Sequence, residues 1–326
     1  VMLTASHNPK QYNGFKAYWS DGAQITPPED QYIIDEYNNL KDWNLVKSGD
    51  FDELMKAGMI SWIDEECIES FYQVTEDHTI NPKMCKENGG KVHFIYTPLH
   101  GTGYIPCETI SKRLGFTNFE IVQSQAEFDS EFSTLKTTPN PEDPEALELA
   151  VALMKEGNAD VAYGTDPDGD RLGVAVNNKG IEHYLNGNQI AILMLHYLFS
   201  QLKEKGKLPA NPLVIKSIVT SPMQKTIVDS FGGTVMDTLT GFKWMARKLG
   251  ELESKSAPYD FIFASEESFG YMPNDNVRDK DAVAAIALMN EISLFYKLQD
   301  KTPVSYTHLR AHETDSYLVC RLLLEK

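Results

Sequence analysis

One unit of sequence occurs three times in this chain: a short run of β-forming residues, a polar or glycine-containing turn, and a stretch with helical periodicity. The first copy starts at Val1, the second follows the break at 88–91, and the third starts near Asn186. Repeated alternation of strand and helix is typical of α/β domains, in which helices pack on a sheet. The sequence therefore predicts tandem α/β domains over residues 1–85, 86–185 and 186–303.

The charge of the chain limits the partners that it can bind. Its 326 residues include 47 acidic and 30 basic side chains, which gives a formal net charge of −17. A field of this sign repels nucleic-acid backbones and anionic membrane surfaces, so we expect neither as a partner. An anionic substrate would require basic side chains gathered locally against the overall sign.

The cysteines and the apolar runs argue against several other classes of protein. The four cysteines form no CxxC pair and have no histidine at metal-ligand spacing, which argues against a zinc site and a disulfide framework. A reducing compartment, the cytoplasm, fits this usage best. The longest apolar run, Ile190 to Phe199, is about half as long as a membrane-spanning helix, so we expect a buried helix there and no membrane segment.

Both ends of the chain carry separate expectations. The sequence opens at Val1 in a strand-like run, without an initiator methionine or a signal peptide, and we expect that an upstream part is missing. From about Ser305 the sequence resembles translated cloning sequence. We therefore expect residues 304–326 to be a non-native tail and exclude them from the fold prediction.

The first polar turn follows the strand expected at residues 1–4. It reads Thr4-Ala5-Ser6-His7-Asn8-Pro9, and Lys16 follows in a second short strand. A serine on a tight turn at the end of a strand presents its hydroxyl outward, as a nucleophile does, with His7 beside it. A Ser-His pair is also common in ordinary polar loops, so this turn alone decides little.

An acidic loop, Asp166-Pro167-Asp168-Gly169-Asp170-Arg171, joins two expected buried strands. Alternate side chains of extended backbone share a face, so the three carboxylates can converge on one hard cation such as Mg²⁺. A calcium-binding EF-hand is excluded, because its required Gly and Glu positions hold Arg171 and Asn177. A solvated acidic turn remains the alternative.

Two further polar segments follow expected strands in the third block. Thr240 to Trp244 contains Lys243, which could face a phosphate, and Ser265 to Gly270 contains Glu266 and Ser268, which could bond sugar hydroxyls. Two more basic residues, Arg278 and Lys280, come shortly afterwards. Each segment by itself is also compatible with an unremarkable surface loop.

Taken together and in this order, the segments TASHNP, DPDGDR, GFKW and EES resemble the four signature loops of the α-D-phosphohexomutase superfamily. They look like its phosphoserine, metal, third-domain and sugar-specificity loops, and the resemblance covers Val1 to about Thr302. Within the superfamily, VMLTASHNPKQYNGFKAY, YTPLHGTG, TDPDGDRLGVAV, DTLTGFKW and VRDKDAV are most similar to the branch that contains phosphoglucomutases and phosphopentomutases. The resemblance implies mixed sheets in domains arranged around a central cleft.

The resemblance also implies an intramolecular phosphotransferase. A phosphorylated Ser6 would pass its phosphoryl group to a sugar monophosphate and take another back, so that glucose 1-phosphate and glucose 6-phosphate interconvert through glucose 1,6-bisphosphate. Mg²⁺ would be held by Ser6, Asp166, Asp168 and Asp170. A phosphopentomutase acting on ribose or deoxyribose 1-phosphate is the nearest alternative, and a non-catalytic sugar-phosphate or metal-binding protein is a second one.

The same resemblance suggests roles for the remaining site residues. Lys16 is favoured as the general base, with His7 orienting phosphate, although an unperturbed lysine pKa of about 10.4 would have to be lowered for that role. Glu266 and Ser268 would bind sugar hydroxyls. A local positive basin would consist of Lys16, Arg171, Lys243, Arg278 and Lys280.

The family's fourth domain, which closes over the cleft, and most of its first domain are expected to be missing from this chain. We therefore expect weak or no turnover from the chain as given, because distal phosphate binding positions the sugar. The residues indicate no particular oligomeric state.

Overall fold

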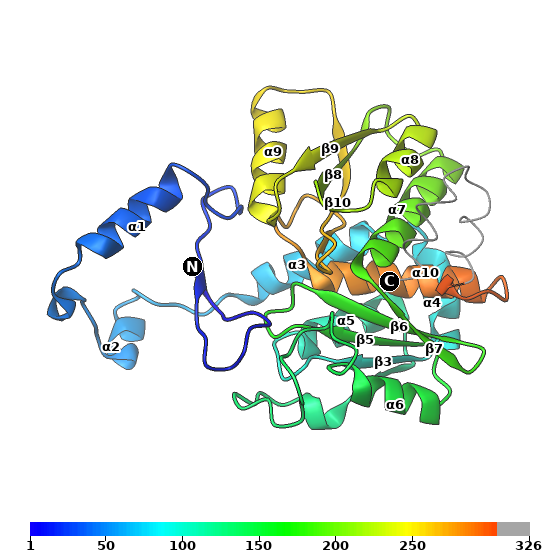
Figure 1. Ribbon diagram of the computed structural model, residues 1–326, viewed down its shortest axis with the longest axis horizontal. Helices are drawn as coiled ribbons and strands as arrows, with labels where there is room; N and C mark the ends of the chain where they lie inside the picture. The colour runs from blue at the N-terminus through cyan, green and yellow to red at the C-terminus, as the bar shows by residue number, and fades with distance from the viewer. Residues whose placement is uncertain (305–326) are drawn as a thin grey trace.

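The computed structural model describes residues 1–304, in which two α/β layers pack on either side of one buried helix (Figure 1). Apart from its first residue, the tail expected at 304–326 lies outside the described residues. The expectation of a mixed α/β fold is confirmed, and both main sheets contain parallel and antiparallel strand pairs. Within residues 1–304 no helix is both long and apolar enough to cross a membrane.

The second block is built on a five-stranded sheet in the order β4-β3-β5-β6-β7. Its strands are β3 (Phe94–Thr97), β4 (Phe119–Ile121), β5 (Val161–Thr165), β6 (Leu172–Asn178) and β7 (Ile181–Leu185). The β3 strand is parallel to β4 and β5, whereas β5, β6 and β7 form an antiparallel meander. Helix α6 (Glu148–Glu156) covers one face and α5 (Tyr104–Leu114) packs on the other side (Figure 1).

The third block has a four-stranded sheet in the order β11-β10-β8-β9. Its strands are β8 (Pro212–Ser217), β9 (Thr234–Thr238), β10 (Asp260–Ser265) and β11 (Tyr271–Met272). Strands β10, β8 and β9 are parallel, and β11 pairs antiparallel to β10. Helix α9 (Phe242–Ser254) lies on one face, and α7 (Gly187–Glu204) and α8 (Met223–Ser230) lie on the other (Figure 1).

Helix α10 (Ala282–Lys297) joins the two blocks and is buried along almost its whole length. Its Glu291 carboxylate accepts hydrogen bonds from the backbone N–H groups of Ile80 and Asn81 and from the Tyr197 hydroxyl. The neighbouring Asn290 amide donates a 3.0 Å hydrogen bond to Ser111 in α5. The buried Glu291 carboxylate is tolerated here because it accepts these three hydrogen bonds.

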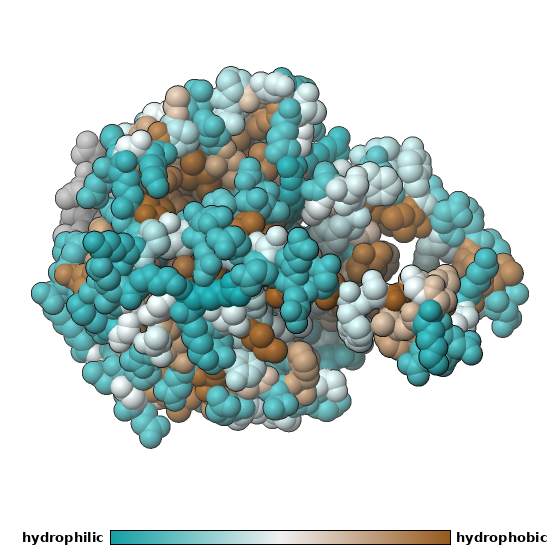
Figure 2. All heavy atoms as spheres, turned by 180° about the vertical axis from the view of Figure 1, so that it is seen from behind, coloured by the Kyte–Doolittle hydropathy of each residue, from teal (hydrophilic) through white to brown (hydrophobic). Residues whose placement is uncertain are grey.

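The first block differs most from the expectation of an α/β domain. Its strands β1 (Met2–Leu3) and β2 (Phe15–Lys16) form only a two-stranded antiparallel ribbon. Its helices are α1 (Glu29–Asn39), α2 (Phe51–Lys56), α3 (Glu65–Asp77) and α4 (Pro82–Asn88). Helices α1 and α2 stand away from the body and have no buried residues, so apolar side chains are visible on this arm in Figure 2.

Three short 3₁₀ helices complete the described elements: η1 (Trp43–Leu45), η2 (Gly89–Lys91) and η3 (Gln123–Gln125). Most expected elements are present with shifted ends. The β-forming run at 213–220 is a strand only as far as Ser217, because the next residues form a turn in which the Thr220 N–H donates to the Ser217 carbonyl. The short strand expected around Lys16 ends at that residue, and only an isolated bridge at Tyr18 continues it.

Candidate active site

Ser6 lies on the turn between β1 and β2, with its backbone in the left-handed region at φ +52°. The Thr4 hydroxyl oxygen accepts a 2.8 Å hydrogen bond from the Ser6 N–H and thereby stabilises the turn. The Ser6 Oγ atom donates a 2.9 Å hydrogen bond to Oδ2 of Asp166 and lies 3.1 Å from Nδ1 of His7. Non-glycine residues held in this region are uncommon and concentrate at functional sites.

The acidic loop begins where β5 ends and returns the chain into β6. Gly169, at φ +70°, allows the tight turn, and its N–H donates to the Asp166 carbonyl. Oδ1 of Asp166 accepts hydrogen bonds from the N–H groups of Asp170 and Arg171. As a result, the carboxylates of Asp166, Asp168 and Asp170 each present an oxygen within 4.8 Å of the others.

These three carboxylates fit a divalent metal ion. Oδ1 of Asp168 and Oδ1 of Asp170 are buried and have no hydrogen-bond partner among residues 1–304. Burial, and then the charges of Asp170 and Asp168, raise the pKa of Asp166. Burial also acts to raise the pKa of Asp168, but its hydrogen bond with Asp166 and the charge of Lys16 outweigh burial and lower this pKa to about 2. Carboxylates this close repel one another, and a hard cation with oxygen ligands would relieve that repulsion.

Two lysines from different blocks converge on the same carboxylates. Lys16 Nζ lies 2.9 Å from Asp168 Oδ2 and 2.5 Å from Asp170 Oδ2, and Lys280 Nζ lies 2.8 Å from Asp170 Oδ2. Burial acts to lower the pKa of Lys16, but the charges of Asp170 and Asp168 outweigh it, and the pKa is raised. With no ion bound, the Lys16 pKa is thus shifted in the direction opposite to the one that a general base requires.

The side chains of the other three basic residues of the expected positive basin are each paired with a carboxylate outside the acidic loop. Arg171 donates a 2.7 Å hydrogen bond to Glu142, and Arg278 donates one of 2.7 Å to Glu253 in α9. Lys243 Nζ lies 3.7 Å from Asp30 in α1 and 5.1 Å from the centre of the Trp244 ring. Only Lys16 and Lys280 among the five residues are paired with the acidic loop in the described structure.

The loop after β10 carries Glu266 and Ser268. The Glu266 side chain is buried, and its Oε1 accepts a 2.5 Å hydrogen bond from the Gly241 N–H, which joins this loop to the TGFKW segment at the start of α9. Gly241 is at φ +110°, a conformation that L side chains rarely adopt. Burial is the main cause of a raised Glu266 pKa. Ser268 is half-buried in the same loop.

Several site residues were not singled out from the sequence. The Thr4 hydroxyl donates a 3.2 Å hydrogen bond to Asp168 Oδ2, which ties the serine turn to the acidic loop. Asp279 accepts hydrogen bonds from the Tyr18 hydroxyl and the Gln24 amide, so it holds the first block against the third. Thr4 lies inside the TASHNP motif, so its position in the sequence could have indicated it as a site residue. Glu142 offered no such signal, because its partner Arg171 is 29 residues away.

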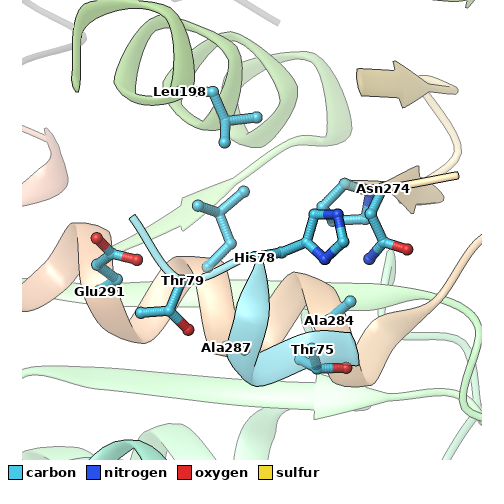
Figure 3. Close-up of a pocket in the computed structure, with 10 residues that line it drawn as sticks. Thr75, His78, Thr79, Leu198, Asn274, Ala284, Ala287 and Glu291 are labelled. Atoms are coloured by element: carbon cyan, nitrogen blue, oxygen red, sulfur yellow. The ribbon is translucent and has the colours of Figure 1, made fainter. Parts of the chain in front are cut away.

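Two hollows of the described surface differ in how well they suit a sugar phosphate. One lies beside the acidic loop, and its lining includes Lys16 and Lys280. The other, shown in Figure 3, lies between α3, α7 and α10, and its lining contains neither lysine nor arginine. The carboxylate in that second lining, Glu291, is already bonded to backbone N–H groups. The first hollow is therefore the better match for an anionic ligand.

Comparison with known families agrees with this arrangement. Models of the phosphoglucomutase/phosphomannomutase α/β/α domains I, II and III match residues 1–43, 70–180 and 186–309, in that order. The fold and the order of these three matches place the chain in a class of multidomain α/β proteins. The chain is a member of the α-D-phosphohexomutase superfamily, in its phosphoglucomutase branch.

Individual relatives give the same result. The chain is 35% identical over 312 residues to a phosphoglucomutase of Staphylococcus haemolyticus, a match that covers 93% of this chain and 53% of that protein. It is 34% identical over 322 residues to a phosphoglucomutase of Staphylococcus aureus strain MRSA252, covering 96% and 55% of the two chains. The chain thus spans about half the length of the curated relatives that it matches.

Solved structures share the fold. A putative phosphomannomutase from Thermus thermophilus superposes with a TM-score of 0.70 at 20% identity, covering 93% of this chain and 60% of that one. The N-acetylphosphoglucosamine mutase of Aspergillus fumigatus, in complex with GlcNAc-6P and magnesium, gives a TM-score of 0.57 at 14% identity, covering 94% and 72%. At these identities the likeness concerns the fold alone.

Proposed function

We propose that the protein is a phosphoglucomutase, which interconverts glucose 1-phosphate and glucose 6-phosphate through a phosphorylated Ser6. The observation that carries the proposal is the 2.9 Å hydrogen bond from Ser6 Oγ to Asp166, inside a cluster of three carboxylates that fits a divalent metal. The phosphoglucomutases of the staphylococcal relatives support the choice of substrate. Mg²⁺ as the metal and glucose 1,6-bisphosphate as intermediate and activator are parts of the same proposal.

In the proposed reaction a hydroxyl of the sugar monophosphate attacks the phosphorus of phosphoserine, and the bond from phosphorus to Ser6 Oγ breaks. The hydroxyl proton leaves to a base, and Ser6 Oγ regains a proton when it departs. Mg²⁺, when held by Ser6, Asp166, Asp168 and Asp170, would neutralise charge on the transferring group. The second phosphate of the bisphosphate then returns to Ser6 by the reverse steps.

The residues around Ser6 fit separate parts of this reaction. Lys16 lies beside Asp168 and Asp170, so in the proposal it neutralises negative charge there. Burial, and then the charge of Arg171, lower the pKa of His7, which favours a neutral ring able to accept a proton. His7 and Lys16 are therefore the two candidates for the base. Glu266 and Ser268 would bond the sugar hydroxyls, and Arg171 would donate to phosphate oxygens.

The test is the covalent state of Ser6. We expect intact-mass analysis after incubation with glucose 1,6-bisphosphate and Mg²⁺ to find one phosphoryl group, mapped to Ser6 and absent from Ser6→Ala. Ser256→Ala is a matched control, because Ser256 is an exposed serine that also has a left-handed backbone, at φ +48°. A chain that binds Mg²⁺ but is never phosphorylated would instead be the non-catalytic binder.

Substrate choice is tested separately. We expect glucose 1-phosphate to be a better substrate than ribose 1-phosphate, and the reverse order would identify a phosphopentomutase. A reducing compartment such as the cytoplasm is part of the proposal, because Cys85 and Cys107 are buried free thiols.

A further inference from the structure

The acidic loop of the second block and the sugar-binding loop of the third block are paired through their backbones. Arg171 and Gly270 form an isolated antiparallel bridge, and the Leu172 N–H donates a 3.0 Å hydrogen bond to the Phe269 carbonyl. On its other side, Gly270 accepts a 3.0 Å hydrogen bond from the Glu266 N–H. Phe269 and Gly270, which pair with the acidic loop, thus also close the turn that carries Glu266 and Ser268.

Phe269 lies at the centre of this junction in an unfavourable conformation. Its φ is +64°, although it is neither glycine nor a small polar residue, and its side chain is only 8% exposed. The ring belongs to the main apolar core and lines a hollow with Val174 and Leu185 of the second block. A bulky residue in the left-handed region is strained, and it persists only where the surrounding structure holds it there.

Residues of the third block contact the loop at 265–270 from its other side. A Cβ atom on Gly187, the first residue of α7, would lie 1.9 Å from the Glu267 carbonyl oxygen, so the helix and the loop are in direct backbone contact. Glu267 Oε2 accepts a 2.8 Å hydrogen bond from the Ser217 hydroxyl at the end of β8. The loop cannot shift without moving either these contacts or the bridge to Arg171.

We propose that Phe269 is a positioning residue that joins the sugar-binding loop to the metal loop, so that a ligand bound at one loop changes the affinity of the other. This inference rests on the proposed function for its two ligands, a sugar phosphate at Glu266 and Ser268 and a divalent cation at the three carboxylates. The coupling follows from the junction, because any displacement of Glu266 is transmitted through Gly270 to Arg171, the residue that follows Asp170. By linkage the effect is reciprocal.

Calorimetric titration with Mg²⁺, in the absence and presence of saturating glucose 1-phosphate, measures this coupling. In the wild-type chain we expect the sugar phosphate to change the Mg²⁺ affinity by at least ~5-fold, the lower end of ordinary coupling between sites. Phe269→Gly relieves the backbone strain and removes the ring, and the change should fall below ~2-fold. The inference is overturned if Phe269→Gly keeps the full coupling or if the wild-type chain shows none.

Phe132→Gly is a matched control, because Phe132 is a phenylalanine with φ +49° in another loop of the second block. It should keep the wild-type coupling, and an equal loss there would also overturn the inference. Phe269→Leu, which keeps an apolar side chain, covers the case in which Phe269→Gly does not fold. It should show a coupling between those of Phe269→Gly and the wild-type chain, and full wild-type coupling would count against the inference.

Amide hydrogen exchange of the unmutated chain provides a second measurement. The Leu172 N–H should exchange more slowly when glucose 1-phosphate is bound, and an unchanged rate would contradict the junction. Both measurements are at equilibrium and need no turnover. If Ser6 is never phosphorylated, the proposed function fails while the coupling can still be observed. If Ser6 is phosphorylated but no coupling is found, only the role of Phe269 fails.

Discussion

The hydroxyl of Ser6 donates a 2.9 Å hydrogen bond to Asp166, although the two residues are 160 positions apart in the sequence. Next to this bond, the Thr4 hydroxyl donates to Asp168. The serine turn and the acidic loop therefore meet through two direct side-chain contacts, from different blocks of the chain. This meeting makes the site sensitive to single substitutions on either side.

Replacement of Asp166 tests the metal site. Asp166→Asn keeps the size of the side chain but removes one of three negative charges, so we expect the Mg²⁺ affinity measured by calorimetry to fall at least ~10-fold. Asp229→Asn, at an exposed aspartate paired with Lys225 in α8, should leave the affinity unchanged. An equal affinity in Asp166→Asn and the wild-type chain would show that the carboxylate is not a ligand.

Lys16 balances the charge of the acidic loop when no divalent ion is bound. Its side chain is only 18% exposed. Lys16→Gln leaves Asp168 and Asp170 with one positive charge fewer beside them. The free energy of unfolding, measured by chemical denaturation in EDTA, should therefore fall by about 2 kcal/mol or more. Excess Mg²⁺ should restore most of this loss, because the ion supplies the missing charge. Lys10→Gln, an exposed lysine beside Glu131, should change the stability by less than about 0.5 kcal/mol. A loss of the same size with and without Mg²⁺ would argue against this role.

Asp281 should make the stability pH-dependent. Burial raises its pKa from 3.8 to about 6, although the N–H groups of Ala284 and Val283 at the start of α10 act in the opposite direction. Between these two values the folded chain keeps a proton that the unfolded chain has lost, so stability should fall as the pH rises through this window. A pKa difference of this size corresponds to about 3 kcal/mol.

The substitution Asp281→Asn keeps an oxygen acceptor for the helix and removes the titration. Denaturation curves from pH 3.8 to about 6 should therefore be flatter for Asp281→Asn than for the wild-type chain. Parallel pH profiles for the two proteins would mean that Asp281 is ionised in both the folded and the unfolded states.

The Glu266 carboxylate is expected to bond both the protein backbone and the sugar. It accepts a hydrogen bond from the Gly241 N–H, and in the proposed function it also bonds a sugar hydroxyl. Glu266→Ala removes both interactions, and the affinity for glucose 1-phosphate should fall about 10-fold, the effect of one or two hydrogen bonds. Glu251→Ala, on the exposed side of α9, is the control. Unchanged binding in Glu266→Ala would remove this loop from the sugar site.

Local patterns predicted much of the fold. The buried strands β5 and β8 and the helix α10 coincide with continuous apolar runs or helical periodicity, which are properties of neighbouring residues. Helix α1 also has helical periodicity, but that pattern does not indicate that its apolar side chains stay exposed in residues 1–304. Periodicity gives the face of a helix, whereas burial depends on what packs against it.

Side-chain partners were much harder to predict than loop positions. The resemblance of four motifs identified Ser6 and the three aspartates, but it could not show that Arg171 pairs with Glu142 or that Lys243 faces Asp30. These contacts join residues that are distant in sequence, and the tertiary arrangement alone determines them. The raised pKa of Lys16 has the same origin, because it depends on two carboxylates from another block.

Helix α10 has a consequence for how the molecule unfolds. Through Glu291 and Asn290 it holds residues near α4 and α5, while its first turn donates, from the Ala282 N–H, to the Gly169 carbonyl of the acidic loop. Helix α10 packs in a core that both blocks share. If one block unfolds and α10 leaves its place, apolar surface of the other block becomes exposed. Residues 65–304 are therefore expected to unfold as one cooperative unit. Calorimetry should show a single heat-absorption peak, whereas two independently folded domains would give two.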